Sequence, residues 1–70
     1  MERHEEALKD LNMAIKLKPG EAHNYNSRGS LYEAMEDQDN ALADYTKAIE
    51  LQPDLAISYY NRGDLYGTMD

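Results

Sequence analysis

The chain has 70 residues, carries 14 acidic against 7 basic side chains, and contains no cysteine. Its net charge of −7 opposes nucleic-acid binding, which needs basic surface to neutralise phosphate, and two separated histidines without cysteine disfavour a structural zinc site. No apolar run approaches the roughly 18 residues of a membrane span, and the charged start MERHEEALKD lacks the apolar segment of a signal peptide, so we expect one small intracellular, cytoplasmic domain.

The first predicted element is a helix over residues 2–17. Apolar residues recur along ALKDLNMAIKL at spacings of three and four, which is the pattern of an amphipathic helix. Pro19 follows and cannot continue the helix, because it has no backbone N–H and its ring clashes with the preceding turn.

A second helix is predicted over residues 22–35, where Ala22 and three later residues fall along one side. The segment EDQDN, residues 36–40, is polar and typical of a turn. We expect Asp39 or Asn40 to cap the next helix, because their side chains accept hydrogen bonds from its free backbone N–H groups.

The third and fourth helices are predicted over residues 40–51 and 56–69, with Pro53 between them. ALADYTKAIEL repeats the apolar stripe of the first helix, and the sequence has no alternating β-branched run that would predict a strand. Loops this short make neighbouring helices antiparallel, so the predicted fold class is all-α.

The sequence repeats itself after 34 residues. When residues 7–36 are aligned with residues 41–70, fourteen of the thirty positions are identical, and most are apolar or small. The motif Arg-Gly-x-Leu-Tyr occurs at residues 28–32 and again at residues 62–66. A period of this length indicates stacked supersecondary units rather than a chance match.

These positions resemble the tetratricopeptide repeat (TPR), a 34-residue helix–turn–helix unit with the pattern W-x2-L-G-x2-Y…A-x3-F…P. The middle of the chain supplies Tyr25-x2-Arg28-Gly29-x2-Tyr32, then Ala41-x3-Tyr45, Ala48 and Pro53. The resemblance implies a single domain, residues 1–70, of antiparallel helix-turn-helix repeats in an α-solenoid. Its parts would be the second helix of a repeat at 2–18, a complete repeat at 22–55 and the first helix of a repeat at 56–70.

The same resemblance implies a set of residues that pack the repeats together. These are Ala7, Leu11, Ala14, Tyr25, Gly29, Tyr32, Ala41, Tyr45, Ala48, Tyr59, Gly63 and Tyr66.

Arginine stands at positions 28 and 62, where the family usually has leucine. We expect each arginine to lay its methylene stem on apolar surface and to pair its head with an aspartate of a facing helix. Asp10 and Asp44 are the candidates. Arg28 would pair with Asp44 of its own unit or with Asp10 across the unit boundary.

Gly29 and Gly63 are expected at close helix contacts, against Ala41 or Ala48, because a glycine inside a helix costs about 1 kcal/mol relative to alanine. The integrin-binding tripeptide Arg-Gly-Asp at residues 62–64 then belongs to a helix rather than to an adhesion loop. Tyr60 faces away from the apolar stripe and is expected to be an exposed contact residue.

The resemblance implies a non-enzymatic protein–protein interaction scaffold, without cofactor or metal, that binds a peptide or partner helix in a concave groove. The groove residues would be His23, Asn26, Ser30, Glu33, Ile57, Tyr60, Asn61 and Asp64. Neither helix of this groove carries a lysine, and Asp64 would repel an acidic tail, so the expected partner is a neutral or basic peptide. Nucleic acid and membranes are not expected partners.

A second hypothesis is a structural unit that assembles with itself. Helices 2–17 and 56–69 each lack a neighbour, so two copies can complete a repeat head to tail, with Lys9, Lys16 and Lys18 near Asp64 or Asp70. Exchange of helices through the EDQDN turn would give a swapped dimer. In a longer array, neighbouring repeats would supply the missing helices.

Overall fold

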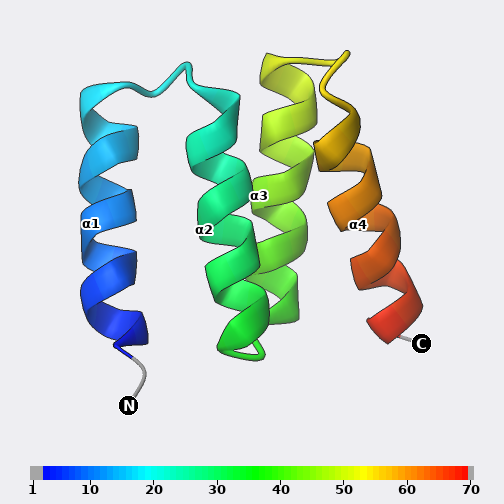
Figure 1. The fold of residues 1–70 in the computed structure, drawn as a ribbon, viewed down its shortest axis with the longest axis horizontal. Helices are drawn as coiled ribbons and strands as arrows, with labels where there is room; N and C mark the ends of the chain where they lie inside the picture. The colour runs from blue at the N-terminus through cyan, green and yellow to red at the C-terminus, as the bar shows by residue number, and fades with distance from the viewer. Residues whose placement is uncertain (1–2, 70) are drawn as a thin grey trace.

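The computed structural model describes residues 3–69, which form four α-helices and no strand. The helices are α1, His4–Leu17; α2, Ala22–Ala34; α3, Gln38–Leu51; and α4, Ala56–Met69. They lie in a row in chain order with neighbours antiparallel, so α1 and α4 occupy opposite ends of the row (Figure 1). The all-α prediction is confirmed, while the expected helix start at residue 2 and Asp70 fall outside the described residues.

The central pair, α2 and α3, has the most extensive contact of any two helices, and α3 also packs against α4. In addition, α2 touches α4 directly, because the Asn26 side-chain amide donates to Ser58 Oγ at 2.8 Å. Within residues 3–69, the only helix against which α1 packs is α2. The row therefore has a well-packed middle and two helices with a free side.

The core lies where α2, α3 and α4 meet. Ala41, Tyr45 and Leu65 form a fully enclosed cluster, and Tyr32 and Leu42 pack against it. In contrast, α1 has no buried residue. Burial of apolar surface is the main favourable term in folding, so the centre of the row supplies most of the stabilisation.

The turn after α2 is closed by backbone hydrogen bonds. Glu36 has a φ of 63°, in the left-handed region. The N–H of Asp37 donates to the Tyr32 carbonyl at 2.8 Å, and the N–H of Glu36 donates to the Glu33 carbonyl at 2.9 Å. This pair of bonds is the Schellman motif, which satisfies carbonyls that a helix end would leave free.

This turn also explains why α3 begins at Gln38 rather than at residue 40. Asp37 is the N-cap, and its side chain accepts from the Asn40 backbone N–H at 3.4 Å and from Asn40 Nδ2 at 2.7 Å. The expectation that Asp39 or Asn40 caps the helix is therefore wrong. The Schellman turn places Asp37 at the N-cap of α3, so Asp39 and Asn40 already belong to the first turn of that helix.

The expected packing residues have different exposures along the row. Gly29, Ala41, Tyr45 and Ala48 are buried in its middle. Leu11, Ala14, Tyr25 and Tyr32 are half-buried, whereas Ala7, Tyr59, Gly63 and Tyr66 are exposed. The exposed members lie on α1 and α4, where no further helix of the described residues covers them.

Candidate functional site

Arg28 joins three helices through its guanidinium group. Nε donates to Asp44 Oδ2 at 2.7 Å and Nη2 donates to Asp44 Oδ1 at 2.8 Å, while Nη1 donates to Asn12 Oδ1 at 2.8 Å. The guanidinium carbon also lies 5.6 Å from the Tyr25 ring centroid and 5.8 Å from that of Tyr32. The hydrogen bond and charge of Asp44 raise the pKa of Arg28, although burial acts against them.

This geometry settles the choice between the two aspartates for Arg28. The pairing with Asp44 inside the unit is confirmed, and the alternative with Asp10 is wrong because Asn12 takes the contact on α1. Two parallel N–H···O bonds between guanidinium and carboxylate are a strong, orientation-specific contact. The pair therefore holds α2 against α3 at a defined register.

Arg62, the repeat equivalent of Arg28, has only part of this arrangement. Its Nη1 donates to Thr46 Oγ1 at 3.4 Å, and its guanidinium carbon lies 5.9 Å from the Tyr59 ring centroid. Among residues 3–69 no carboxylate pairs with Arg62, so the expectation that each arginine has an aspartate is wrong for this one. The reason is positional, because no helix of these residues lies on the far side of α4.

The two repeat glycines also differ in their surroundings. A Cβ added to Gly29 would lie 2.6 Å from Cε1 and 2.8 Å from Cδ1 of the Tyr45 ring. A Cβ added to Gly63 would meet nothing within 4 Å among the described residues. The close approach expected at Gly29 is thus observed, and the nearest atoms belong to the Tyr45 ring.

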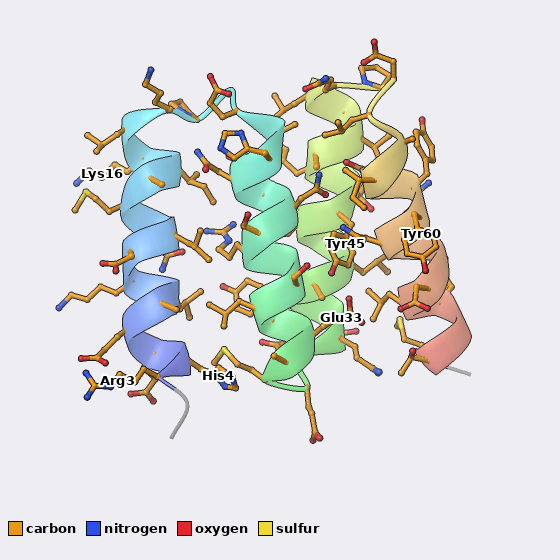
Figure 2. All side chains as sticks on the ribbon, in the orientation of Figure 1. Arg3, His4, Lys16, Glu33, Tyr45 and Tyr60 are labelled. Atoms are coloured by element: carbon orange, nitrogen blue, oxygen red, sulfur yellow. The ribbon has the colours of Figure 1, made fainter. Side chains whose placement is uncertain are left out.

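A polar cluster surrounds the hydroxyl of Tyr45, which projects from α3 between α2 and α4 (Figure 2). The hydroxyl donates to Glu33 Oε1 at 2.5 Å and lies 3.2 Å from Ser30 Oγ. Burial raises the pKa of Tyr45 to about 12, assisted by the Glu33 hydrogen bond and the charges of Glu33 and Asp64, while the Ser30 bond lowers it. Glu33 of α2 therefore bonds this hydroxyl directly, and the negative charge of Asp64 on α4 acts on it more weakly.

The residues expected to line a groove lie on α2 and α4, but not all of them are accessible. His23, Ser30, Ile57, Tyr60 and Asp64 are exposed, and Glu33 and Asn61 are half-buried. Tyr60 is 71% exposed, as its position opposite the apolar stripe predicts. The expected tripeptide Arg-Gly-Asp lies inside α4.

Asn26 differs from the other expected groove residues because it is buried. Its side-chain amide nitrogen donates to Ser58 of α4, and its Oδ1 is buried with no hydrogen-bond partner among residues 3–69. Asn26 thus connects two helices of the site and does not present its side chain to a ligand.

Elsewhere the structure has a hollow on α1, lined by Glu6, Lys9, Asp10 and Met13. No group of three or more His, Cys, Asp or Glu side chains that could hold a metal ion occurs within residues 3–69. In the same residues, no helix is long and apolar enough to cross a membrane.

Comparison with known proteins bears directly on this arrangement of helices. A family model described as TPR repeat matches residues 29–70, more than half of the chain. The chain belongs to the TPR repeat family. TPR repeats generally mediate protein–protein interaction, and this is the general function that membership of the family gives to the chain. A search of curated proteins gave no match.

Sequence reasoning missed several residues of the TPR packing. Ser58 and Leu65 are completely buried, and Asn12 and Thr46 accept from the two arginines. The 34-residue register contained a signal for the last two, because Asn12 and Thr46 are equivalent positions and both carry a side-chain oxygen. Nothing local distinguishes Ser58 from an exposed serine, because its burial depends on Asn26 reaching across from α2.

Proposed function

We propose that this chain binds a neutral or basic peptide, or a partner helix, on the surface formed by α2 and α4. The observation that carries the proposal is a pair of carboxylates, called here the acidic cluster: Glu33 of α2, which accepts from the Tyr45 hydroxyl, and Asp64 of α4, whose charge also acts on that hydroxyl. A lysine or arginine of a bound peptide would donate to these carboxylates, as cations and acids pair across interfaces.

Exposed apolar side chains lie next to the acidic cluster. Ile57, Tyr60 and Asp64 are three and four residues apart on α4, so they share one face of that helix. Tyr60 and Ile57 are 71% and 51% exposed. A ligand that buries them while it pairs with Asp64 gains both apolar contact and charge complementarity, and tyrosine is favoured at such contacts.

The surface is supported by contacts that keep α2 and α4 in place. The Asn26–Ser58 hydrogen bond joins the two helices at 2.8 Å, and the ring of Tyr45, from α3, is buried in the core against which they pack. Because these groups have defined positions before a ligand arrives, little ordering cost would be added on binding.

Nuclear magnetic resonance titration tests the proposal. The ¹⁵N-labelled chain is titrated with two unstructured peptides of equal length, one rich in lysine and arginine and the other rich in glutamate. We expect the basic peptide to shift the amide signals of Ser30, Glu33, Tyr60, Asn61 and Asp64, and the acidic peptide to bind more weakly.

A matched pair of variants separates the site from general charge. Asp64→Asn removes one carboxylate of the cluster and should weaken the basic peptide by about two- to fivefold, since an exposed charge contact contributes roughly 0.5–1 kcal/mol. Glu50→Gln removes an exposed carboxylate of α3 and should leave the affinity unchanged. Equal affinity for the two peptides, or shifts confined to α1 and α3, would overturn the proposal.

A second candidate function is self-association, and one observation favours it. Tyr59 and Tyr66 on α4 are 47% and 50% exposed, while Met13 and Leu17 on α1 are 52% and 72% exposed, so apolar surface remains at both ends of the row. Exposed apolar patches commonly mark contact sites. Sedimentation velocity over a concentration series tests this candidate, and a folded monomer at every concentration would exclude it.

A further inference from the structure

The contacts of Arg28 follow a simple rule in the repeat register. Its guanidinium bonds the residue 16 positions before it, Asn12, and the residue 16 positions after it, Asp44. Arg62 obeys the first half of the rule, because Thr46 also precedes it by 16 positions. The second half of the rule would place an acid 16 positions after Arg62, at position 78 if the repeat numbering is continued past the 70 residues of the chain.

Asp10 has the complementary deficiency. It is the repeat equivalent of Asp44, yet within residues 3–69 it has no ion-pair or hydrogen-bond partner. It is exposed on α1 and contributes to the hollow formed with Glu6, Lys9 and Met13. If a second copy continues the repeat after the first, its residues are numbered two periods, or 68 positions, higher. Asp10 of that second copy then stands at position 78, where the rule places an acid.

The apolar surfaces at the two ends follow the same register. On α4, Gly63 is open where its equivalent Gly29 is covered by the Tyr45 ring, and Leu11 of α1 is the equivalent of Tyr45. Ala7 is exposed where its equivalent Ala41 is completely buried. A second copy's α1 would therefore present to α4 the side that α3 presents to α2.

The directions of the helices agree with this placement. α1 and α4 lie at opposite ends of the row and run in opposite directions, so α1 of a second copy continues the antiparallel order after α4 (Figure 1). The interface would extend the helix order already present inside the chain.

We propose that the chain associates head to tail, with α4 of one copy bound to α1 of the next and Arg62 of the first paired with Asp10 of the second. The inference rests on the second candidate function, self-association, and names its arrangement. Because the two surfaces differ, a junction leaves α1 of the first copy and α4 of the second unbound. Both can bind further copies, so assembly continues into a ring or an open stack. A swapped dimer would stop at two copies.

Charge reversal tests the pairing. Arg62→Asp places an acid opposite Asp10, and Asp10→Arg places a base opposite Arg62, so each variant alone has like charges at the junction. We expect each to associate at least tenfold more weakly than the wild-type chain in sedimentation velocity, because like charges placed against each other in an interface oppose binding.

An equimolar mixture of the two variants makes the test decisive. Every junction between unlike variants then carries an opposite-charge pair, because either the two substituted side chains meet or the native Arg62 meets the native Asp10. We expect the mixture to recover wild-type association, as should the double variant Arg62→Asp/Asp10→Arg. Circular dichroism of each variant checks that it is folded, and Glu50→Arg on α3 is the control for a charge reversal away from the junction.

The outcomes separate the two levels of the proposal. A wild-type chain that stays monomeric overturns self-association and the junction together. Association that stops at a dimer, or that ignores the single reversals, or that the mixture fails to restore, overturns the head-to-tail junction and leaves self-association standing. Weakening by both single variants with recovery in the mixture supports it.

Discussion

Arg28 and Asp44 form a bidentate ion pair between α2 and α3, with N···O distances of 2.7 and 2.8 Å. The side chain of Asp44 is only 7% exposed and that of Arg28 is 21% exposed, so both charges are largely removed from water. Arginine is suited to this position because its planar group meets Asp44, Asn12 and two tyrosine rings at once.

Removal of either member of this pair should destabilise the fold. We expect Arg28→Ala and Asp44→Ala each to lower the free energy of unfolding by about 2–4 kcal/mol, because each leaves a shielded charge without its partner. In the double variant the losses should not add, with a coupling energy of about 1–3 kcal/mol in urea unfolding. An osmolyte such as trimethylamine N-oxide keeps weakened variants within the measurable range.

The pair Arg62→Ala and Asp44→Ala is the control for this cycle. Arg62 donates to Thr46 and has no bond to Asp44, so these two losses should add within about 0.5 kcal/mol. Additive losses for the Arg28 and Asp44 variants would instead show that their pairing contributes nothing to stability.

The two repeat glycines should respond to alanine in opposite ways. Gly29→Ala places a methyl group 2.6 Å from the buried Tyr45 ring, and we expect a loss of about 1–3 kcal/mol from this overpacking. Gly63→Ala meets no atom within 4 Å among the described residues and should stabilise the monomer by about 1 kcal/mol through helix propensity. Urea unfolding at low protein concentration measures both, and a gain for Gly29→Ala would contradict the close contact.

The hydroxyl of Tyr45 should contribute to stability in a pH-dependent way. Tyr45→Phe removes the bond to Glu33 and should cost about 2 kcal/mol at neutral pH, since the acceptor is charged. The folded-state pKa of about 12 exceeds the ordinary value of 10.0, so this contribution is complete below pH 10 and is lost as the pH rises through 12.

The measurement for this prediction is the difference in unfolding free energy between the wild-type chain and Tyr45→Phe from pH 8 to pH 12. Subtraction cancels the titration of the other tyrosines. Tyr60→Phe is the matched control, because Tyr60 is 71% exposed and should change stability by less than about 0.5 kcal/mol. A difference that stays constant up to pH 12 would argue against the bond.

Glycine at position 36 should stabilise the turn between α2 and α3. Glu36 has a φ of 63°, which costs a residue with a Cβ about 1 kcal/mol relative to glycine. We therefore expect Glu36→Gly to raise the free energy of unfolding by about 0.5–1 kcal/mol after the extra chain entropy of glycine is included. Glu50→Gly, within α3, should lower it by about 1 kcal/mol, and the same sign for both would disprove the left-handed turn.

The helices and the family could be predicted from the sequence because their signals are local. The apolar spacing, the prolines after residues 18 and 52, and the 34-residue period indicate helix-turn-helix repeats without knowledge of any contact. The boundary at α3 was misjudged because the cap depends on the turn geometry at Glu36, which composition does not reveal. The helix pattern places the expected groove residues on α2 and α4, whereas the burial of Asn26 has no local signal.

The 34-residue period alone identifies which residues occupy equivalent places in the repeat. Arg28 and Arg62, like Gly29 and Gly63, are identical in type and stand in the same motif, Arg-Gly-x-Leu-Tyr. The packing of the helices then makes these places different, because Arg28 is paired and Gly29 covered, while Arg62 and Gly63 face an open side. The physical reason is that pairing and burial depend on the helix that lies opposite, and among the described residues α3 lies against α2 whereas no helix lies beyond α4.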